Sequence, residues 1–165
     1  MVALILIPLR GFHDQDLLEL IDILKDKVYV ATENREVAIG KLGTKVLPDF
    51  SFKEILYINS NPFDKLIIIA DEGWKRLDLP EVKTIIAGFL YGYKTVIIIS
   101  LAPVLLAQFG FLAGKIVTYN NKEFPQYEPL LIKYGVKVVD FPVFKDGYII
   151  SARGRESVKM ITKYL

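Results

Sequence analysis

The chain has 165 residues, of which 52% are hydrophobic and 24% are charged, so it is long enough for one domain with a sizeable core. Its 21 Lys and Arg residues against 19 Asp and Glu residues give a formal net charge of +2 without a basic cluster, which argues against nucleic-acid binding. The absence of cysteine excludes disulfides, thiolate metal ligands and cysteine-based redox sensing. A single histidine argues against a zinc or copper site. We therefore predict one domain over residues 1–165, with no metal and no cofactor.

The N-terminal run from Met1 to Leu9 is apolar but too short to span a membrane. It has no basic lead and no small-residue cleavage pattern, and charged sequence follows after Arg10. We predict that this run is a buried first strand and that the protein is cytoplasmic, with no membrane contact.

Strands and helices alternate along the chain. Continuous apolar, β-branched runs are typical of parallel strands that are covered on both faces. The predicted strands span residues 2–8, 27–32, 66–69, 95–99, 116–119, 136–139 and 148–151. Two of the predicted helices are placed by their caps: one begins near His13-Asp14 and extends to Leu24, and one follows Pro103. Four more are predicted over residues 52–58, 80–91, 127–134 and 155–164. Residues 37–39 and 45–47 are predicted to form a short hairpin. This order predicts an α/β fold with a single doubly wound, mostly parallel sheet flanked by helices.

The segment Val96–Lys115 carries the most specific functional signal. A β-branched run ends abruptly at Ser100, and Pro103 then opens an apolar helical segment that stops near Gly110. A buried strand that turns tightly into a helix lifts a nucleophile to the carboxyl edge of an α/β sheet. We therefore predict that Ser100 lies in a tight turn with sparsely populated backbone dihedrals.

This segment resembles the nucleophile elbow of the DJ-1/PfpI superfamily, in which Ile-Cys-His-Gly-Pro precedes a Leu-Leu-Ala helix. On that pattern the cysteine of the family falls on Ser100, its histidine on Leu101 and its glycine on Ala102, while Pro103 is kept. The resemblance implies a flavodoxin-like, class I glutamine amidotransferase-like fold and a homodimer or higher homo-oligomer. Other segments are similar to family motifs along the whole chain: Pro8–Leu17, Gly43–Glu54, Asp64–Asp71 and Val138–Gly154.

The departures from the family pattern lie at the chemistry. Ile69-Ala70-Asp71 stands where the family has Pro-Gly-Gly, whose backbone N–H groups stabilise an oxyanion. Ala70 can still offer its N–H, but the carboxylate of Asp71 would oppose negative charge that develops nearby. Leu101 cannot transfer a proton, and Tyr119 stands where the family often has histidine or tyrosine. The candidate pocket residues are therefore Ala70, Asp71, Leu101 and Tyr119, and the cysteine chemistry of the family is excluded.

Two functions stay open at this stage. The leading hypothesis is a catalytically degenerate DJ-1/PfpI-like protein that acts as a scaffold, an oligomer partner or a binder of a small molecule at the elbow pocket. The alternative is a hydrolase of peptidase, deglycase or esterase type, with Ser100 as nucleophile, His13 as base and Asp16 orienting the imidazole. In the first case Ser100 is a small residue tolerated in a turn, and His13 begins a helix. Hydrogen-bond reach between His13 and Ser100 would discriminate between them.

Three further residues allow both structural and functional interpretations. Asp16 falls on a family glutamate that hydrogen-bonds the cysteine, so it could accept a bond from Ser100 or be an ordinary acid in the first turn of a helix. Arg153 resembles the arginine of the family's Arg-Gly ending, and we interpret it as structural. Trp74 either packs in the core or lies at a rim or interface.

Overall fold

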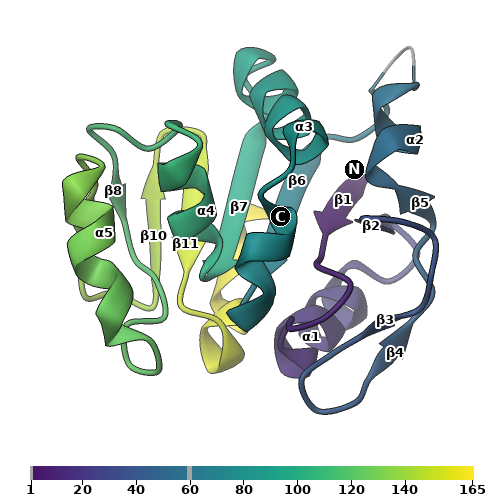
Figure 1. Ribbon diagram of the computed structural model, residues 1–165, viewed down its shortest axis with the longest axis horizontal. Helices are drawn as coiled ribbons and strands as arrows, with labels where there is room; N and C mark the ends of the chain where they lie inside the picture. The colour runs from purple at the N-terminus through teal and green to yellow at the C-terminus, as the bar shows by residue number, and fades with distance from the viewer. Residues whose placement is uncertain (1, 59–60) are drawn as a thin grey trace.

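A computed structural model describes residues 2–58 and 61–165; Met1, the first residue of the apolar N-terminal run, lies outside this part (Figure 1). The centre of the molecule is a seven-stranded sheet in the order β10-β11-β7-β6-β1-β2-β5. All neighbouring strands are parallel except β10 and β11, which confirms the predicted doubly wound, mostly parallel sheet. The strands are β1 (Ala3–Leu6), β2 (Val28–Thr32), β5 (Phe50–Ser51), β6 (Lys65–Ala70), β7 (Thr95–Ser100), β10 (Val143–Asp146) and β11 (Ile149–Ala152).

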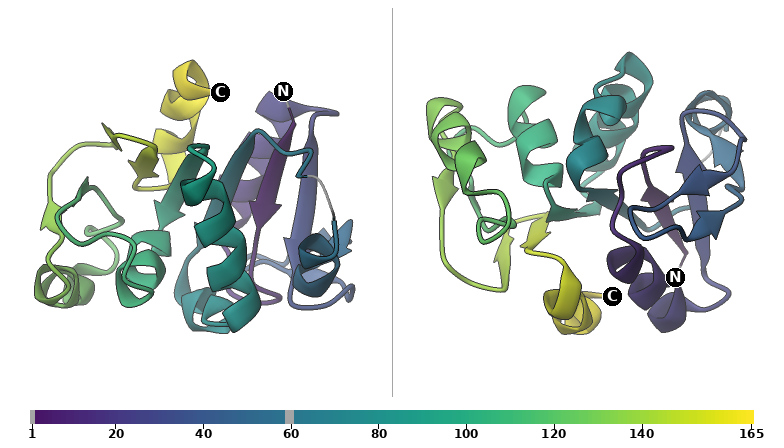
Figure 2. Two further views of the ribbon diagram at one scale, coloured as in Figure 1. Left: turned by 90° about the horizontal axis from the view of Figure 1, so that it is seen from above. Right: turned by 60° about the horizontal axis from the view of Figure 1, so that its bottom comes forward.

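Helices cover both faces of the sheet (Figure 2). One face carries α1 (Asp14–Leu24) and the C-terminal 3-10 helix η3 (Arg155–Tyr164). The other face carries α2 (Phe52–Leu56), α3 (Pro80–Tyr91) and α4 (Ala102–Gln108), with α5 (Glu128–Lys133) beside α4. The smaller elements are the antiparallel pair β3 (Ala38–Ile39) and β4 (Lys45–Val46), the parallel pair β8 (Ile116–Val117) and β9 (Lys137–Val138), and the 3-10 helices η1 (Glu72–Leu77) and η2 (Pro125–Tyr127).

The central strands are apolar at every position because both of their faces are buried. Successive side chains of a strand point to opposite faces. Ile98 therefore packs in the core beneath α3 and α4, whereas Ile97 and Ile99 pack in the core beneath α1 and η3. The parallel register of β6 and β7 pairs Ala70 with Ser100, so both strands end side by side at one edge of the sheet.

Several element predictions need correction. β10 was not predicted, because its sequence Val-Phe-Lys-Asp is only partly buried and lacks the apolar run of a central strand. β5, which has two residues, was not predicted either. The strands predicted over 116–119 and 136–139 are limited to Ile116–Val117 and Lys137–Val138, and they pair in a separate two-stranded sheet. The last helix is of the 3-10 type, and the helix predicted over 127–134 begins with η2 and continues as α5. Trp74 is a core residue, with 3% of its surface exposed and its indole N–H donating to the hydroxyl of Tyr127.

No helix in the described part of the chain is long and apolar enough to cross a membrane.

Candidate functional site

Ser100 occupies the predicted elbow at the end of β7. Its φ of 62° lies in the left-handed region, which non-glycine residues rarely adopt, and the residue is fully buried. α4 begins two residues later with Pro103 in its first turn, a position where the missing N–H of proline costs nothing. The prediction of a strained strand-to-helix turn is confirmed.

The hydroxyl of Ser100 is hydrogen-bonded to side chains from two other segments. Its Oγ donates to Oδ1 of Asp71 at 2.7 Å and accepts from Nδ2 of Asn120 at 3.3 Å. Asp71 follows directly after β6, and the pairing of Ala70 with Ser100 brings the carboxylate next to the hydroxyl. The proton of this serine is thus directed at a carboxylate.

These contacts continue into a closed loop of side chains, which we call the Ser100 ring: Ser100, Asp71, Arg155, Glu123 and Asn120. Nη2 of Arg155 donates to Oδ1 of Asp71 at 2.9 Å and to Oε1 of Glu123 at 3.1 Å. Nδ2 of Asn120 closes the loop by donating to Oε2 of Glu123 at 2.8 Å. The ring joins the last residue of β7 to residues that follow β6, β8 and β11, and the hydroxyl of the elbow is part of it.

Two further side chains support the ring from outside. Asp16, from the first turn of α1, accepts from the backbone N–H of Arg155 at 2.5 Å and from Nη1 of Arg155 at 2.8 Å. Lys41, from the loop between β3 and β4, donates to Oδ2 of Asp71 at 2.6 Å and lies 3.0 Å from Oε1 of Glu72. Asp16 and Asp71 are fully buried, and a buried carboxylate is tolerated only where it is paired and hydrogen-bonded in this way.

The two buried carboxylates differ in pKa. Burial alone would raise the pKa of Asp71, but hydrogen bonds from Lys41, Arg155 and Ser100 outweigh it and lower the pKa below its usual value. Asp71 therefore stays ionised, which makes it a weak base and places a fixed negative charge beside Ser100. Burial raises the pKa of Asp16 to about 6, against the opposing charge and hydrogen bonds of Arg155.

His13 lies at the start of α1 as predicted, where it caps the helix. Its Nδ1 accepts the backbone N–H of Gln15 at 3.2 Å. Burial, and next the charge of Arg155, lower the pKa of the imidazole. Within residues 2–58 and 61–165, no hydrogen bond joins His13 to Ser100. The carboxylate of Asp16 accepts from Arg155, and not from His13 or Ser100.

The backbone and side-chain donors near the elbow are also engaged. The N–H of Leu101, which follows the serine, donates to the carbonyl oxygen of Ala70 at 2.7 Å. Tyr119 is fully buried, and its hydroxyl donates to the carbonyl oxygen of Phe124 at 2.9 Å. Burial raises the pKa of Tyr119 to about 12, so its proton is not available near neutral pH.

Four residues of this network were not predicted from the sequence: Lys41, Asn120, Glu123 and Arg155. The arginine singled out was Arg153, which instead pairs with the exposed carboxylate of Asp140. One signal could have indicated two of the four, Lys41 and Arg155. A carboxylate that replaces glycine at Asp71, directly after a buried strand, needs cationic partners, and Lys41 and Arg155 supply them.

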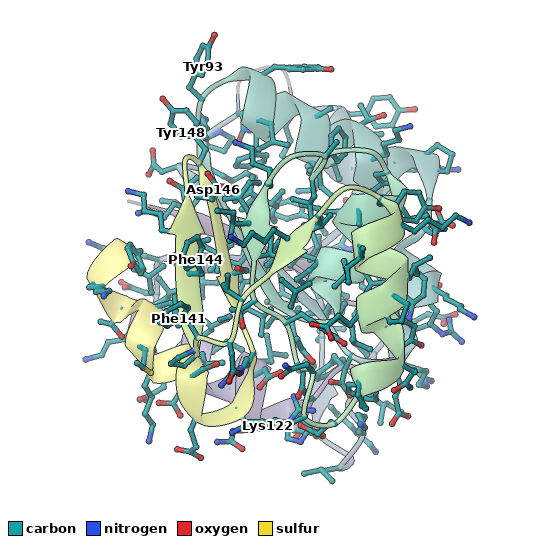
Figure 3. All side chains as sticks on the ribbon, turned by 90° about the vertical axis from the view of Figure 1, so that its left-hand side faces the viewer. Tyr93, Lys122, Phe141, Phe144, Asp146 and Tyr148 are labelled. Atoms are coloured by element: carbon teal, nitrogen blue, oxygen red, sulfur yellow. The ribbon has the colours of Figure 1, made fainter. Side chains whose placement is uncertain are left out.

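A cleft of about 370 Å³ adjoins the ring. Its lining includes Asn120, Lys122, Glu123, Arg153, Arg155 and Glu156. Lys122, one of the lining residues, is labelled at the bottom of Figure 3. β1 and β7 end toward the same side of the molecule in Figure 1.

The architecture agrees with comparisons to known proteins. The model of the DJ-1/PfpI family matches residues 1–165. The chain belongs to the DJ-1/PfpI family. It is 28% identical over 156 residues to the protein named Deglycase PfpI from Pyrococcus furiosus. This match covers 92% of this chain and 90% of that protein. It is also 28% identical over 163 residues to an uncharacterized protein of Methanocaldococcus jannaschii, covering 96% of this chain and 77% of the relative.

Solved structures support the same fold for this DJ-1/PfpI family member. A ThiJ/PfpI domain protein from Brachyspira murdochii superimposes with a TM-score of 0.86 at 22% identity, covering 98% of this chain and 92% of the other. DJ-1beta from Drosophila melanogaster superimposes with a TM-score of 0.82 at 24% identity, covering 98% of this chain and 87% of the other. Among the described residues of this family member, no group of three or more His, Asp or Glu side chains could hold a metal ion.

Proposed function

We propose that this chain is a catalytically degenerate DJ-1/PfpI protein that acts by binding, as a scaffold, a small-molecule binder or an oligomer partner. The observation that carries the proposal is the hydrogen bond from Ser100 to the ionised carboxylate of Asp71, inside a closed ring of side chains. A serine needs a base to become a nucleophile. An aspartate whose pKa is lowered is poorly suited to that task.

Acyl transfer also requires donors for a developing oxyanion, and here they are compromised. The N–H of Leu101 already bonds the carbonyl oxygen of Ala70. The negative charge of Asp71 lies against the reacting position and would destabilise an oxyanion there. Loss of an oxyanion donor or a base commonly costs about 10² to 10⁴ in rate.

The alternative function is a hydrolase with Ser100 as nucleophile and His13 as base, and one observation favours it. The lowered pKa of His13 keeps the imidazole in its neutral form, which can accept a proton. The name Deglycase PfpI belongs to a relative at 28% identity and is compatible with this alternative. The hydroxyl of Ser100 would first have to exchange its bond to Asp71 for one to His13.

Turnover assays decide between the two functions. Purified protein should show only background conversion of methylglyoxal, a glycated amine and an activated ester, with Ser100→Ala and His13→Ala variants indistinguishable from it. Robust turnover that both substitutions abolish would establish the serine hydrolase. Ser100→Cys together with Leu101→His restores the reactive pair of the family. We expect this pair to gain substantial activity only when Asp71→Gly also removes the carboxylate.

We also propose that the chain forms a homodimer or a larger homo-oligomer. Figure 3 shows Tyr93, Tyr148, Phe144 and Phe141 following one another along the β10 side of the molecule. The exposed fractions of Tyr93, Tyr148 and Phe141 are 75%, 48% and 53%, so this face offers apolar surface that a second copy could cover. Light scattering should show a dimer or larger species at micromolar concentration, and Tyr148→Glu should shift it toward the monomer. A wild-type protein that stays monomeric would contradict the prediction.

We also propose that the protein is located in the cytoplasm.

A further inference from the structure

The outer part of the Ser100 ring differs from its inner part in exposure. Ser100 and Asp71 are fully buried, and Asn120 is 4% exposed. The side chain of Glu123, in contrast, is 45% exposed and lines the adjoining cleft. Glu123 is therefore the member of the ring that can leave it without crossing the protein interior.

Glu123 is held as a bound carboxylate would be held. Its two oxygens accept from two different donors, with Oε1 bound by Nη2 of Arg155 at 3.1 Å and Oε2 bound by Nδ2 of Asn120 at 2.8 Å. A two-point contact of this kind fixes both the position and the orientation of a planar carboxylate.

Both donors have other hydrogen-bond partners besides the carboxylate of Glu123. Arg155 is fixed by Asp16 and Asp71, which together engage its backbone N–H and two guanidinium nitrogens. The side-chain carbonyl of Asn120 accepts the backbone N–H of Glu123 at 3.4 Å, and its amide also reaches Ser100. Rigid, pre-oriented donors lower the cost of binding a ligand in place of Glu123.

The cleft in front of these donors has the charge and the space for such a ligand. Lys122 lines it and forms no ion pair with any residue of the described chain. Nε of Arg153, also in the lining residues, is buried without an acceptor among the described atoms. When Glu123 leaves, Glu156 is the remaining acidic side chain of the lining, beside three cationic ones. Arg153 is paired with Asp140, and Arg155 with Asp16 and Asp71, which leaves Lys122 as the cation of the lining without an ion pair among the described residues.

We propose that Arg155 and Asn120 form a binding subsite for the carboxylate of a small organic acid, and that Glu123 occupies this subsite in the resting protein. A ligand acid displaces the side chain of Glu123 into solvent, accepts from the same two nitrogens and extends into the cleft beside Lys122. The displacement also opens the ring in front of Ser100. The proposal rests on the proposed function in taking the closed ring as the resting state, and it names the ligand class that such a binding protein would take.

Acetate is the probe that tests the subsite, in NMR titrations that follow the side-chain amide of Asn120. Glu123→Ala should bind acetate about tenfold more tightly than the wild type, because the internal competitor is gone. The matched control is Glu156→Ala, which removes the same charge from the same cleft but leaves the subsite filled; it should bind acetate as the wild type does. Acetamide, which lacks the charge, should not bind saturably to any variant.

Equal gains in Glu123→Ala and Glu156→Ala would overturn the proposal, because the effect would then be general electrostatics. No saturable binding to a folded Glu123→Ala variant would overturn it as well. A second measurement uses the absence of cysteine: Ser100→Cys introduces a unique thiol, whose labelling by a disulfide reagent reports access to the elbow. Labelling should be about fivefold faster when Glu123→Ala is added, and unchanged with Glu156→Ala. Turnover by the wild type would refute the proposed function while leaving these binding results intact.

Discussion

Replacing Asp16 with asparagine should remove a pH dependence of stability that the buried carboxylate creates. The pKa of Asp16 is about 6 in the folded protein, against 3.8 for an ordinary aspartate. The folded protein therefore holds this proton more tightly than the unfolded chain does. Asp16 contributes stability that is fully present below its unfolded pKa of 3.8 and is lost as the pH rises through about 6.

The size of the effect follows from the two pKa values. The interval between 3.8 and about 6, at 1.36 kcal/mol per unit, corresponds to about 3 kcal/mol in the free energy of unfolding. Urea denaturation of the wild type and of Asp16→Asn should be measured at several pH values from 4 to 7. The difference in unfolding free energy between the two proteins should shift by roughly this amount across that range, in favour of the wild type at the acid end. A difference that stays constant with pH would refute the reasoning, because Asp16 would then have an unshifted pKa.

Two further predictions concern the segment that carries Arg155. Arg155→Met should cost about 3 to 5 kcal/mol in the free energy of unfolding, because it leaves the buried carboxylates of Asp16 and Asp71 without their guanidinium. Arg153→Met is the control, and should cost about 1 kcal/mol or less in urea denaturation, since its partner carboxylate is 84% exposed. Equal losses would contradict the importance assigned to the ring. Gly154→Ala should lower the melting temperature more than Gly43→Ala, although the two glycines have nearly the same φ, 96° and 97°. An added Cβ at Gly154 would lie 2.9 Å from Oδ2 of Asp16, whereas one at Gly43 would meet nothing within 4 Å. Equal melting temperatures for the two alanine variants would show that Asp16 yields to the added atom.

Much of the fold could be predicted from local sequence. The aliphatic runs of β1, β6 and β7 are long and continuous because both faces of a central parallel strand are buried, so pattern alone identifies them. The elbow at Ser100 was predictable for a similar reason, since an apolar strand followed by Pro103 leaves room only for a tight turn. β10 was missed because an edge strand carries polar residues, and its pairing with β11 depends on tertiary context.

The site was only half predictable, because its charges come from distant parts of the chain. Asp16, Asp71 and Ser100 each follow a predicted strand, and the topology of a parallel sheet brings such positions to one edge. Lys41 and Arg155 carry no local signal of that kind. Arg155 lies 139 residues from Asp16, and only the packing of η3 against α1 brings the two together.

The departures from the family pattern are physically linked. A carboxylate at Asp71 could not be buried beside Ser100 without a cation, and Arg155 and Lys41 provide two. The guanidinium in turn needs Asp16 and Glu123 to complete its hydrogen bonds, so its partners extend to the surface of the adjoining cleft. Asp71→Gly, a reversion toward the family residue, would thus remove one carboxylate partner from Arg155 and one from Lys41, and its effect on stability would not add to that of a second change in the network. For this reason the residues that replace the family pattern at the elbow also build a polar network, and the half-exposed carboxylate of Glu123 is the member of that network through which we propose that a ligand enters.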